Sequence, residues 1–232
     1  MRKDGGATAQ EPSGRVGQRR RLTRARLLQA AYEVMSEVGV DGAKIKDITE
    51  RADVGFGTFY SYFSSKDELA AQVLDCIIND LGKRNLLATR SLRALDEAMV
   101  MPVSIRLTLR EAACETMWQW WARRPDLLVD RMREGFGPFA QADIRTAISA
   151  GRFRLDEREV SQAWAISVWM MVGAIHDMVI RGRTLESEKF QVEAIMRLMG
   201  LEPADAHRVA NSALPDYPKA AIDWTFVLGV PR

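Results

Sequence analysis

The sequence is poor in the residues that form most catalytic and metal sites. It contains only two cysteines, Cys76 and Cys114, and two histidines, His176 and His207. It has no Gly-x-Ser-x-Gly motif, no His/Cys metal-ligand spacing and no phosphate-binding glycine loop. We therefore expect a protein that is not an enzyme and that holds neither a metal nor a cofactor. So few cysteines fit a reducing cytoplasm.

Long hydrophobic runs are also missing. Charged residues interrupt every apolar stretch before it reaches the roughly 18 residues that cross a bilayer, and the polar, Gly-rich N-terminus lacks the apolar region of a secretory signal. We expect a soluble cytoplasmic protein with no membrane partner. With 47% hydrophobic residues among 232, the chain can bury a sizeable core in one larger domain and one small domain.

A helix-turn-helix pattern lies in residues 45–66. Apolar residues recur every three or four positions before residue 53 and again after residue 55, and residues 53–55 interrupt this helical spacing. The apolar residues with this spacing are Ile45, Ile48 and Ala52, followed by Phe59 and Phe63. Two short helices joined by a tight turn make a helix-turn-helix. The second helix presents hydroxyls and aromatic rings, which suits a helix that lies in a DNA groove.

A more specific motif occupies the same residues. It comprises Ala52, Asp53, Val54, then Gly57, Thr58, Phe59, Tyr60, Ser61, Tyr62, Phe63, then Lys66, Asp67, Glu68 and Leu69. In order and spacing this run resembles the DNA-binding module of the TetR family of bacterial transcriptional repressors, from about Arg24 to Leu74. The resemblance implies an all-α fold with an N-terminal three-helix helix-turn-helix domain and a larger C-terminal helical domain for ligand binding and dimerisation.

The resemblance also implies which side chains meet a double-stranded DNA operator. It places the phenols of Tyr60 and Tyr62 at phosphate- or base-contacting positions, while Thr58 and Ser61 are short enough to reach base edges. Gly57 allows the backbone to approach a phosphate closely. The full set of expected DNA-binding residues is Lys44, Lys46, Gly57, Thr58, Tyr60, Ser61, Tyr62 and Lys66, in which the lysines are expected to bind phosphates.

Several positions depart from the family pattern. Ala43 and Lys44 stand where a Ser or Thr cap is usual, so the second helix loses its hydroxyl cap. Asp53 replaces a common glycine and tolerates positive φ better than most residues. Gly55 replaces a Ser cap, and Phe56 stands where a polar or basic residue is frequent. These changes leave DNA binding expected and the operator sequence open.

Basic charge is concentrated ahead of this module. The whole chain has a net charge of only +2, but residues 1–26 hold eight basic and two acidic side chains, a net charge of +6. Residues 1–18 are rich in Gly, Pro, Ser and Gln and are expected to form a disordered arm. The arm is either a simple tail or a source of phosphate or minor-groove contacts from Arg15 and Arg19 to Arg21.

Apolar periodicity and the positions of Gly and Pro predict the remaining helices. We expect a first helix from Thr23 to Val38 with Leu28, Ala31, Met35 and Val38 buried. The other expected helices span 66–81, 102–123, 126–133, 139–150, 156–180 and 204–213, with loose chain at 82–93 and flexibility at 135–138. The expected domains are therefore a basic arm at 1–18, the helix-turn-helix domain at 19–66, the regulatory and dimerisation domain at 67–203, and an extension at 204–232.

The 156–180 helix is apolar nearly all round, which indicates that more than one face is covered. One stripe consists of Val160, Trp164, Ser167, Met171, Ala174 and Met178, and the other of Ala163, Ile166, Met170, Gly173 and Ile180. By resemblance, this helix and the next one, with Phe190, Ile195, Leu198 and Met199, form a four-helix bundle with a second copy. A two-fold homodimer is expected. The apolar 204–232 extension is expected to dock on the pocket mouth or across the dimer.

Analogy with the family also favours a cavity for a small apolar or aromatic effector. The expected ligand-binding residues are Met117, Trp118, Trp121, Phe136, Phe139, Trp164, Met170, Met171 and His176. Each of them could instead be simple core, and His176 could be a satisfied core histidine. Cys76 and Cys114 are expected to be inert core thiols, with a redox pair as the alternative.

We therefore predict a transcriptional repressor that binds a palindromic operator as a dimer and is released by a small molecule, through a shift between two arrangements of its helices. Activation is the alternative direction of control. The alternative mechanism is a helix-turn-helix protein controlled by a protein partner, or one with no inducer.

Overall fold

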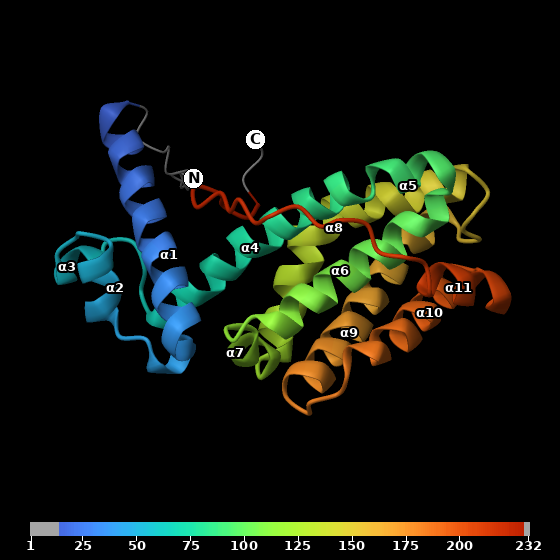
Figure 1. The fold of residues 1–232 in the computed structure, drawn as a ribbon. Coiled ribbons are helices and arrows are strands. Elements are labelled where there is room, and N and C mark those ends of the chain that lie inside the picture. Colours follow the sequence, from blue (N-terminus) through green and yellow to red (C-terminus); the bar gives the residue numbers. More distant parts are fainter. Residues whose placement is uncertain (1–13, 230–232) are drawn as a thin grey trace, which may run out of the picture.

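The computed structural model describes residues 14–229, and in this part of the chain all regular structure is helical (Figure 1). None of the described helices is long and apolar enough to cross a membrane. The predicted all-α fold is confirmed. Most of the predicted arm lies in residues 1–13, outside the described residues.

Three helices form the N-terminal domain: α1 (Arg15–Gly42), α2 (Ile45–Arg51) and α3 (Phe56–Phe59). The prediction that α1 begins at Thr23 is wrong. Arg15 to Leu22 continue the helix toward the N-terminus, because Arg, Gln and Leu are good helix formers, and Thr23 is a buried interior residue. Gly39, the predicted stop, has φ 74° and interrupts the helix there, but helical structure resumes and ends at Gly42.

The buried face of α1 differs from the predicted stripe. Leu28, Ala31 and Met35 are fully buried as expected. Val38 is exposed, and Leu27, Ala30 and Val34 are buried although the predicted stripe omitted them. This helix covers the backs of α2 and α4.

The long helix α4 (Lys66–Ala88) joins the two halves of the molecule (Figure 1). Ser65 caps it by accepting a hydrogen bond from the Glu68 amide at 3.1 Å. The expected loosening after Leu81 is wrong, because Gly82 lies inside the helix against the Phe139 ring. A close approach of α8 therefore holds the glycine in helical structure.

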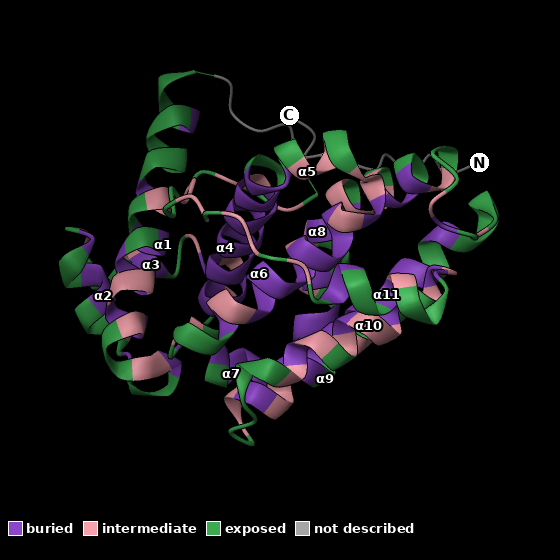
Figure 2. Cartoon of the chain, turned by 45° about the vertical axis from the view of Figure 1, so that its right-hand side comes forward, coloured by how far each residue is buried: buried purple, intermediate pink, exposed green. Residues whose placement is uncertain are grey.

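The C-terminal domain is built from stacked helices. Its elements are α5 (Arg90–Leu95), η1 (Glu97–Met99), α6 (Val100–Cys114), α7 (Trp118–Ala122), α8 (Pro125–Ser149), η2 (Glu157–Glu159), α9 (Val160–Val179), η3 (Leu185–Ser187), α10 (Glu188–Leu198) and α11 (Pro203–Ala210). Figure 2 shows buried residues where α4, α6 and α8 meet, whereas the N-terminal turns of α1 are largely exposed.

Helix α8 corrects the prediction of two helices separated by a flexible 135–138 segment. It runs unbroken through Gly135, Gly137 and Pro138. Gly135 lies so close to Ile78 of α4 that a Cβ atom there would be 2.4 Å from Ile78 Cγ2. The glycine that suggested a break is thus the residue that lets α8 pack directly on α4.

Helix α9 buries the first predicted stripe but leaves much of the second uncovered in the single chain. All six residues of the first stripe, from Val160 to Met178, are buried. In the second stripe, Ile166 and Gly173 are exposed. On α10, Phe190 is exposed, but Ile195 and Met199 are fully buried in their own subunit and do not belong to an outer face.

Residues 211–229, which follow α11, contain no helix and are half-buried or exposed. Residues 211–229 run back from α11 along α6 and α4 toward α1 (Figure 1). This C-terminal segment contacts α4 and α1 of its own chain, whereas the sequence predicts docking on the pocket mouth or across the dimer.

Candidate DNA-binding surface and ligand pocket

The turn between α2 and α3 is tight. Its amides stay close to α2, since Asp53 N donates to Glu50 O at 3.1 Å and Val54 N to Thr49 O at 3.0 Å. Asp53 has φ 53°, so the positive φ anticipated for this aspartate is present. The Lys44 side chain makes no capping hydrogen bond to α2, and Gly55, at the start of α3, has no side chain to cap it. The cap loss inferred from the sequence is therefore present.

Two buried rings fix the position of α3. Phe59 and Phe63 are fully buried, with ring centroids 5.8 Å apart, and they pack among the core residues of α1 and α2. The regular α-helix ends at Phe59, four residues earlier than predicted, and continues as hydrogen-bonded turns in which Ser61 N donates to Thr58 O. The opposite face is left for solvent or a ligand.

That outer face carries the predicted hydroxyl and aromatic groups. Tyr60 is 55% exposed and packs edge-on against Phe59 and against exposed Phe56. Ser61 and Gly57 are exposed, and Thr58 and Tyr62 are half-buried. No atom lies within 4 Å of a Cβ built on Gly57, so the backbone there is open to close approach.

A groove separates this face from the first turns of α1. It is lined by Val16, Arg19, Arg20, Thr23, Arg26, Asp53, Val54, Gly55, Thr58, Ser61 and Tyr62. The Arg20 guanidinium lies 5.8 Å from the centre of the Tyr62 ring. The early helical start of α1 thus fixes basic side chains beside α3, which the prediction of a disordered arm missed.

The three predicted lysines occupy different environments. Lys44 is exposed at the start of α2, and Lys46 is exposed, with its Nζ 3.7 Å from Glu50 Oε1. Lys66 is partly engaged: its Nζ donates to Asp41 O at 3.1 Å and to Ala43 O at 2.9 Å. The Lys66 ammonium therefore also ties the end of α1 to the start of α4.

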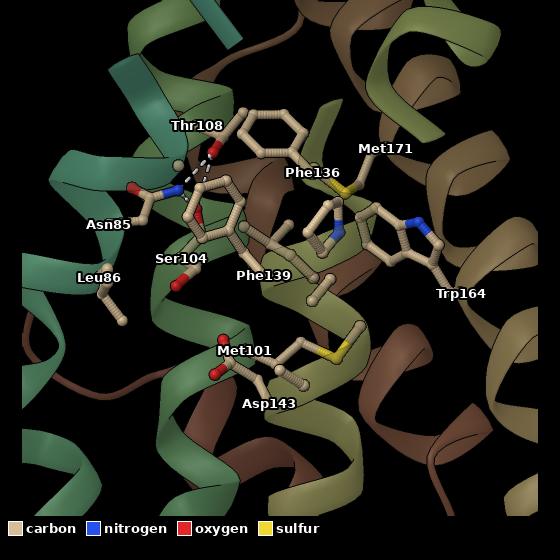
Figure 3. A pocket seen from close by; sticks show the side chains of 15 residues that line it. Asn85, Leu86, Met101, Ser104, Thr108, Phe136, Phe139, Asp143, Trp164 and Met171 are labelled. Atoms are coloured by element: carbon tan, nitrogen blue, oxygen red, sulfur yellow. Dashed lines mark hydrogen bonds between the residues drawn. The ribbon is translucent and has the colours of Figure 1, made fainter. Parts of the chain in front are cut away.

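A cavity of about 260 Å³ lies between α4, α6, α8 and α9 (Figure 3). Four predicted ligand residues, Phe136, Phe139, Trp164 and Met171, line it together. The other lining residues are Gly82, Asn85, Leu86, Met101, Ser104, Ile105, Thr108, Pro138, Ala140, Ala142 and Asp143. Helix α4, which the sequence predicts only as a connecting rod, thus forms one wall of the cavity.

The polar groups at this cavity were missed by sequence reasoning. Asn85 Nδ2 donates to Thr108 Oγ1 at 3.0 Å and to Ser104 O at 3.3 Å (Figure 3). Asp143 accepts from Arg93 Nη2 at 2.6 Å. Burial raises the pKa of Asp143, against the lowering effect of Arg93. The cavity therefore has an apolar aromatic side and a few hydrogen-bonding groups, the composition of a small-molecule site.

The remaining predicted ligand residues lie elsewhere. Met117, Trp118 and Trp121 line a separate cavity of about 40 Å³ beside α1 and the C-terminal segment. Met170 and His176 line neither cavity. The His176 side chain is partly exposed, with Nδ1 3.9 Å from Asp177 Oδ1, so it is not a fully buried core histidine.

The cysteines do not form a pair. Cys76 is buried, and burial raises the pKa of its thiol to about 12, which suits an inert thiol. Cys114 is exposed, so its assignment to the core is wrong: it is the last residue of α6, where the chain leaves the packed face. Within residues 14–229, no group of His, Cys, Asp and Glu could hold a metal ion.

An apolar face on α9 and α10 has no partner within the described chain. It contains Trp169, which is 49% exposed, Phe190, which is 77% exposed, and exposed Ile166 and Gly173. We call these four residues the α9–α10 face. Large exposed apolar side chains on neighbouring helices are a candidate interaction surface.

Comparison with known families matches both halves of the chain. Residues 27–73 match a domain described as "Bacterial regulatory proteins, tetR family". Residues 96–212 match one described as "Tetracyclin repressor-like, C-terminal domain". Residues 213–229 follow the end of the second match.

Curated relatives share mainly the N-terminal part. The chain is 47% identical over 53 residues to the uncharacterised HTH-type transcriptional regulator YvdT of Bacillus subtilis, covering 23% of this chain and 27% of that protein. It is 34% identical over 94 residues to the HTH-type transcriptional repressor DhaR of a Mycobacterium species, covering 40% and 44%. These matches thus span less than half the length of either relative.

Solved structures extend the similarity over nearly the whole fold. RolR in complex with the ligand resorcinol is 27% identical, with a TM-score of 0.78 over 87% of this chain and 99% of that chain. The regulator FadR of Bacillus subtilis in complex with stearoyl-CoA is 16% identical, with a TM-score of 0.54 over 75% of this chain and 96% of that chain, and shares the fold.

Proposed function

Because the chain belongs to the TetR family of bacterial regulatory proteins, we propose that it represses transcription by binding a palindromic operator as a homodimer and is released by a small aromatic molecule. Family membership makes it a DNA-binding transcription regulator and not an enzyme. The observation that carries the proposal is the outward face of α3, which buried Phe59 and Phe63 hold in place.

For DNA recognition, the proposed contacts follow from exposure and chemistry. The Tyr60, Thr58 and Ser61 side chains would meet base edges and the sugar-phosphate backbone in the major groove. Gly57 would allow a phosphate to approach the start of α3, and Tyr62 would contact a phosphate beside Arg20. The remaining proposed contacts are to phosphates from Lys44, Lys46 and, with its remaining N–H donor, Lys66.

For assembly, the α9–α10 face would bind the same face of a second copy. In a two-fold dimer the same surface of each copy forms the interface, so the exposed apolar side chains of one copy are buried against the α9–α10 face of the other. It also presents two α3 helices to successive turns of B-DNA, about 34–36 Å apart. We propose that residues 19–66 form the DNA-binding domain, that 67–203 form the regulatory and dimerisation domain, and that 1–18 and 204–232 extend them. The protein would act in the cytoplasm, where operator DNA is found.

For regulation, the 260 Å³ cavity suits one aromatic ring. Phe136, Phe139 and Trp164 would pack on the ring, while Thr108 and Asp143 could each hydrogen-bond a ring hydroxyl. The similarity to RolR, which binds resorcinol, supports a monocyclic phenol as the effector class. The presence of this cavity also favours small-molecule control over control by a protein partner alone.

The DNA-binding proposal is tested by selecting bound duplexes from a random pool and then measuring affinity for the selected sequence. Tyr60→Ala should weaken binding by roughly tenfold or more, the loss of one good contact. Leu95→Ala is the matched control, because Leu95 is 79% exposed on α5, far along the chain from α3. If both variants bind like the wild type, α3 does not read the DNA.

The effector proposal is tested by titrating a panel of monocyclic phenols, including resorcinol, into the protein–operator complex. An effector should dissociate the complex, and Thr108→Val should weaken binding of the effector to the free protein. A panel in which no phenol binds the free protein would reject this effector class while leaving DNA binding unaffected.

A further inference from the structure

The segment 213–229, which we call the C-terminal strap, connects the two domains. It contains no helix, yet it lies on α4 in one half of the molecule and on α1 in the other (Figure 1). Helix α4 is the covalent connection between these halves, and the α1–α7 contact, where Ser36 Oγ lies 3.3 Å from Met117 Sδ, is a small one. The strap is thus an additional connection across the same boundary.

Helix α4 carries polar residues that fit the strap. Ala221 N donates to Asp80 Oδ1 at 3.0 Å, and Arg84 Nη1 donates to Pro218 O at 3.3 Å. The Arg84 guanidinium also lies over the Tyr217 ring, 4.5 Å from its centre. Arg84 is only 7% exposed, and a charge so well buried requires partners. Its ionic partners are Asp80 Oδ2 at 2.7 Å and Glu111 Oε2 at 2.9 Å, and the strap adds the Pro218 carbonyl and the Tyr217 ring to this cluster.

The far end of the strap holds α1. The Trp224 and Tyr32 rings pack with centroids 5.2 Å apart. Phe226 O accepts a hydrogen bond from Arg24 Nη1 at 3.2 Å. Both Tyr32 and Arg24 belong to the helix that supports α2, so the position of the strap bears on the orientation of the DNA-binding domain.

The near end of the strap touches the wall of the cavity. The Tyr217 hydroxyl donates to Asn85 Oδ1 at 2.9 Å. The same Asn85 amide donates to Thr108 Oγ1 at 3.0 Å, and both residues line the cavity. One side chain therefore hydrogen-bonds the strap through its oxygen and a cavity-lining hydroxyl through its nitrogen.

We propose that the C-terminal strap transmits the state of this cavity to the DNA-binding domain, an inference that rests on the proposed function. An effector hydroxyl that engages Thr108 or the Asn85 amide turns Asn85 and weakens its bond to Tyr217. The strap then loosens, Trp224 leaves Tyr32, and α1 is free to shift relative to α4. The strap is therefore the element with two states, docked and released. Effector binding in the cavity and operator binding by the DNA-binding domain each shift the equilibrium between these states.

The ligand-free arm of the test asks whether the strap restrains α1. Hydrogen exchange is measured on the full chain, on Trp224→Ala and on the control Val227→Ala, whose side chain is 42% exposed. Trp224→Ala should raise exchange in α1 by roughly fivefold or more, a typical coupling between sites, while Val227→Ala and the α9 peptides stay unchanged. Unchanged α1 exchange in Trp224→Ala and after truncation at Ser212 would overturn the proposal.

The second arm uses resorcinol as the probe and Tyr217→Phe, which removes only the hydroxyl. In the wild type, resorcinol should slow exchange around the cavity, speed exchange in the strap and weaken operator binding by roughly fivefold or more. In Tyr217→Phe, cavity protection should persist, while the ratio of operator Kd with and without resorcinol falls toward one. An unchanged ratio would refute transmission through the strap.

The two arms separate the two proposals. If resorcinol does not protect the cavity helices, the proposed effector class fails, and the ligand-free arm alone decides whether the strap restrains α1. If resorcinol protects the cavity and α1 responds equally in wild type and Tyr217→Phe, the effector class stands and the strap is not the route.

Discussion

Gly135 shows how one missing methyl group sets a distance between helices. A Cβ at this position would lie 2.4 Å from Ile78 Cγ2, which requires α8 or α4 to move. Gly135→Ala should therefore lower the free energy of unfolding by about 1–3 kcal/mol. Gly137→Ala is the matched control on the same helix, because its nearest neighbour would be 3.7 Å away, and it should be neutral or stabilising by up to about 1 kcal/mol. Equal urea midpoints for the two variants would contradict this packing.

Asp75 on α4 predicts a pH dependence of stability. Burial raises its pKa to about 6, although Arg131 Nη1, 2.8 Å from Asp75 Oδ2, lowers it. A carboxyl with a higher pKa in the folded chain stabilises the fold below its unfolded pKa, and this contribution is lost as the pH rises through the folded value.

Asp75→Asn removes that titration. The stability of the wild type relative to the variant should therefore fall by roughly 1–3 kcal/mol between pH 4 and pH 6.5. Urea unfolding of both proteins across this range measures the difference directly. A difference that is constant with pH would show that Asp75 does not titrate in this window.

Residue-level expectations succeeded where a short motif determines the local geometry. The positive φ of Asp53 and the burial of Phe59 and Phe63 follow from the turn and from a four-residue spacing. Asn85 and Thr108 could not be identified in this way. They lie 23 positions apart in the sequence, and they meet only because α4 packs on α6.

At the scale of elements, α6 and α10 are joined by a buried cluster of charges. Glu188 is fully buried, and its carboxylate accepts from Arg106 Nε at 3.0 Å and from Arg110 Nη2 at 2.8 Å. Removing one charge from such a cluster leaves the buried Arg106 without its counter-ion.

Glu188→Gln should therefore destabilise the protein by about 3 kcal/mol or more in thermal or urea unfolding. Glu186→Gln is the control, since Glu186 is exposed and pairs with Lys189 at 3.0 Å, and it should have no measurable effect. If Glu188→Gln is as stable as this control, the charge cluster does not join the two helices.

The first turns of α1 make a prediction about salt dependence. If Arg19 and Arg20 contact phosphates, the Arg19→Ala, Arg20→Ala double variant loses up to two contacts. The slope of log K against log salt should then become shallower by roughly 1–2 units. The control is Arg154→Ala, Arg158→Ala, because both side chains are exposed and lie far from α3 in the C-terminal domain. Equal slopes for the two double variants would exclude phosphate contacts from Arg19 and Arg20.

Element boundaries were predictable where capping and periodicity agree, and not where packing overrides them. The end of α9 at Val179 agrees with the predicted end at Ile180, but residues 157–159 of the predicted helix form the separate element η2. The break expected at 135–138 follows equally well from glycine and proline propensity, but the contact of Gly135 with α4 keeps α8 helical. The contact between Gly135 and Ile78 could not be predicted from the sequence around Gly135, because Ile78 lies on another helix.

At the scale of the whole molecule, the C-terminal strap changes how the two domains communicate. Docking of the apolar C-terminal segment could be predicted from its composition, but its partners could not. Asp80 and Arg84 on α4 are both buried, pair with each other at 2.7 Å and also hydrogen-bond the strap. Because charged residues are rarely buried without partners, buried charges on a helix indicate that another segment covers it.

The proposed homodimer leads to a prediction for the complete assembly. Trp169 is 49% exposed on the α9–α10 face, so Trp169→Glu places a charge where two copies would meet without disturbing the core of either. Burying an unpaired carboxylate in an apolar interface is costly. The variant should be monomeric by light scattering at micromolar concentration, with unchanged helicity, and Leu95→Glu should remain dimeric because Leu95 lies on α5.

Loss of the dimer has a consequence for DNA that distinguishes it from a local defect. Each monomer keeps an intact α3, so Trp169→Glu should still bind a half-site weakly. It should lose the additional operator affinity that comes from binding two half-sites at once, which is often 10²- to 10⁴-fold. Changing the half-site spacing by five base pairs puts the second site on the opposite side of the duplex. That change should weaken wild-type binding strongly and leave Trp169→Glu unaffected. Equal sensitivity of both proteins to spacing would show that the two reading helices are paired through another surface.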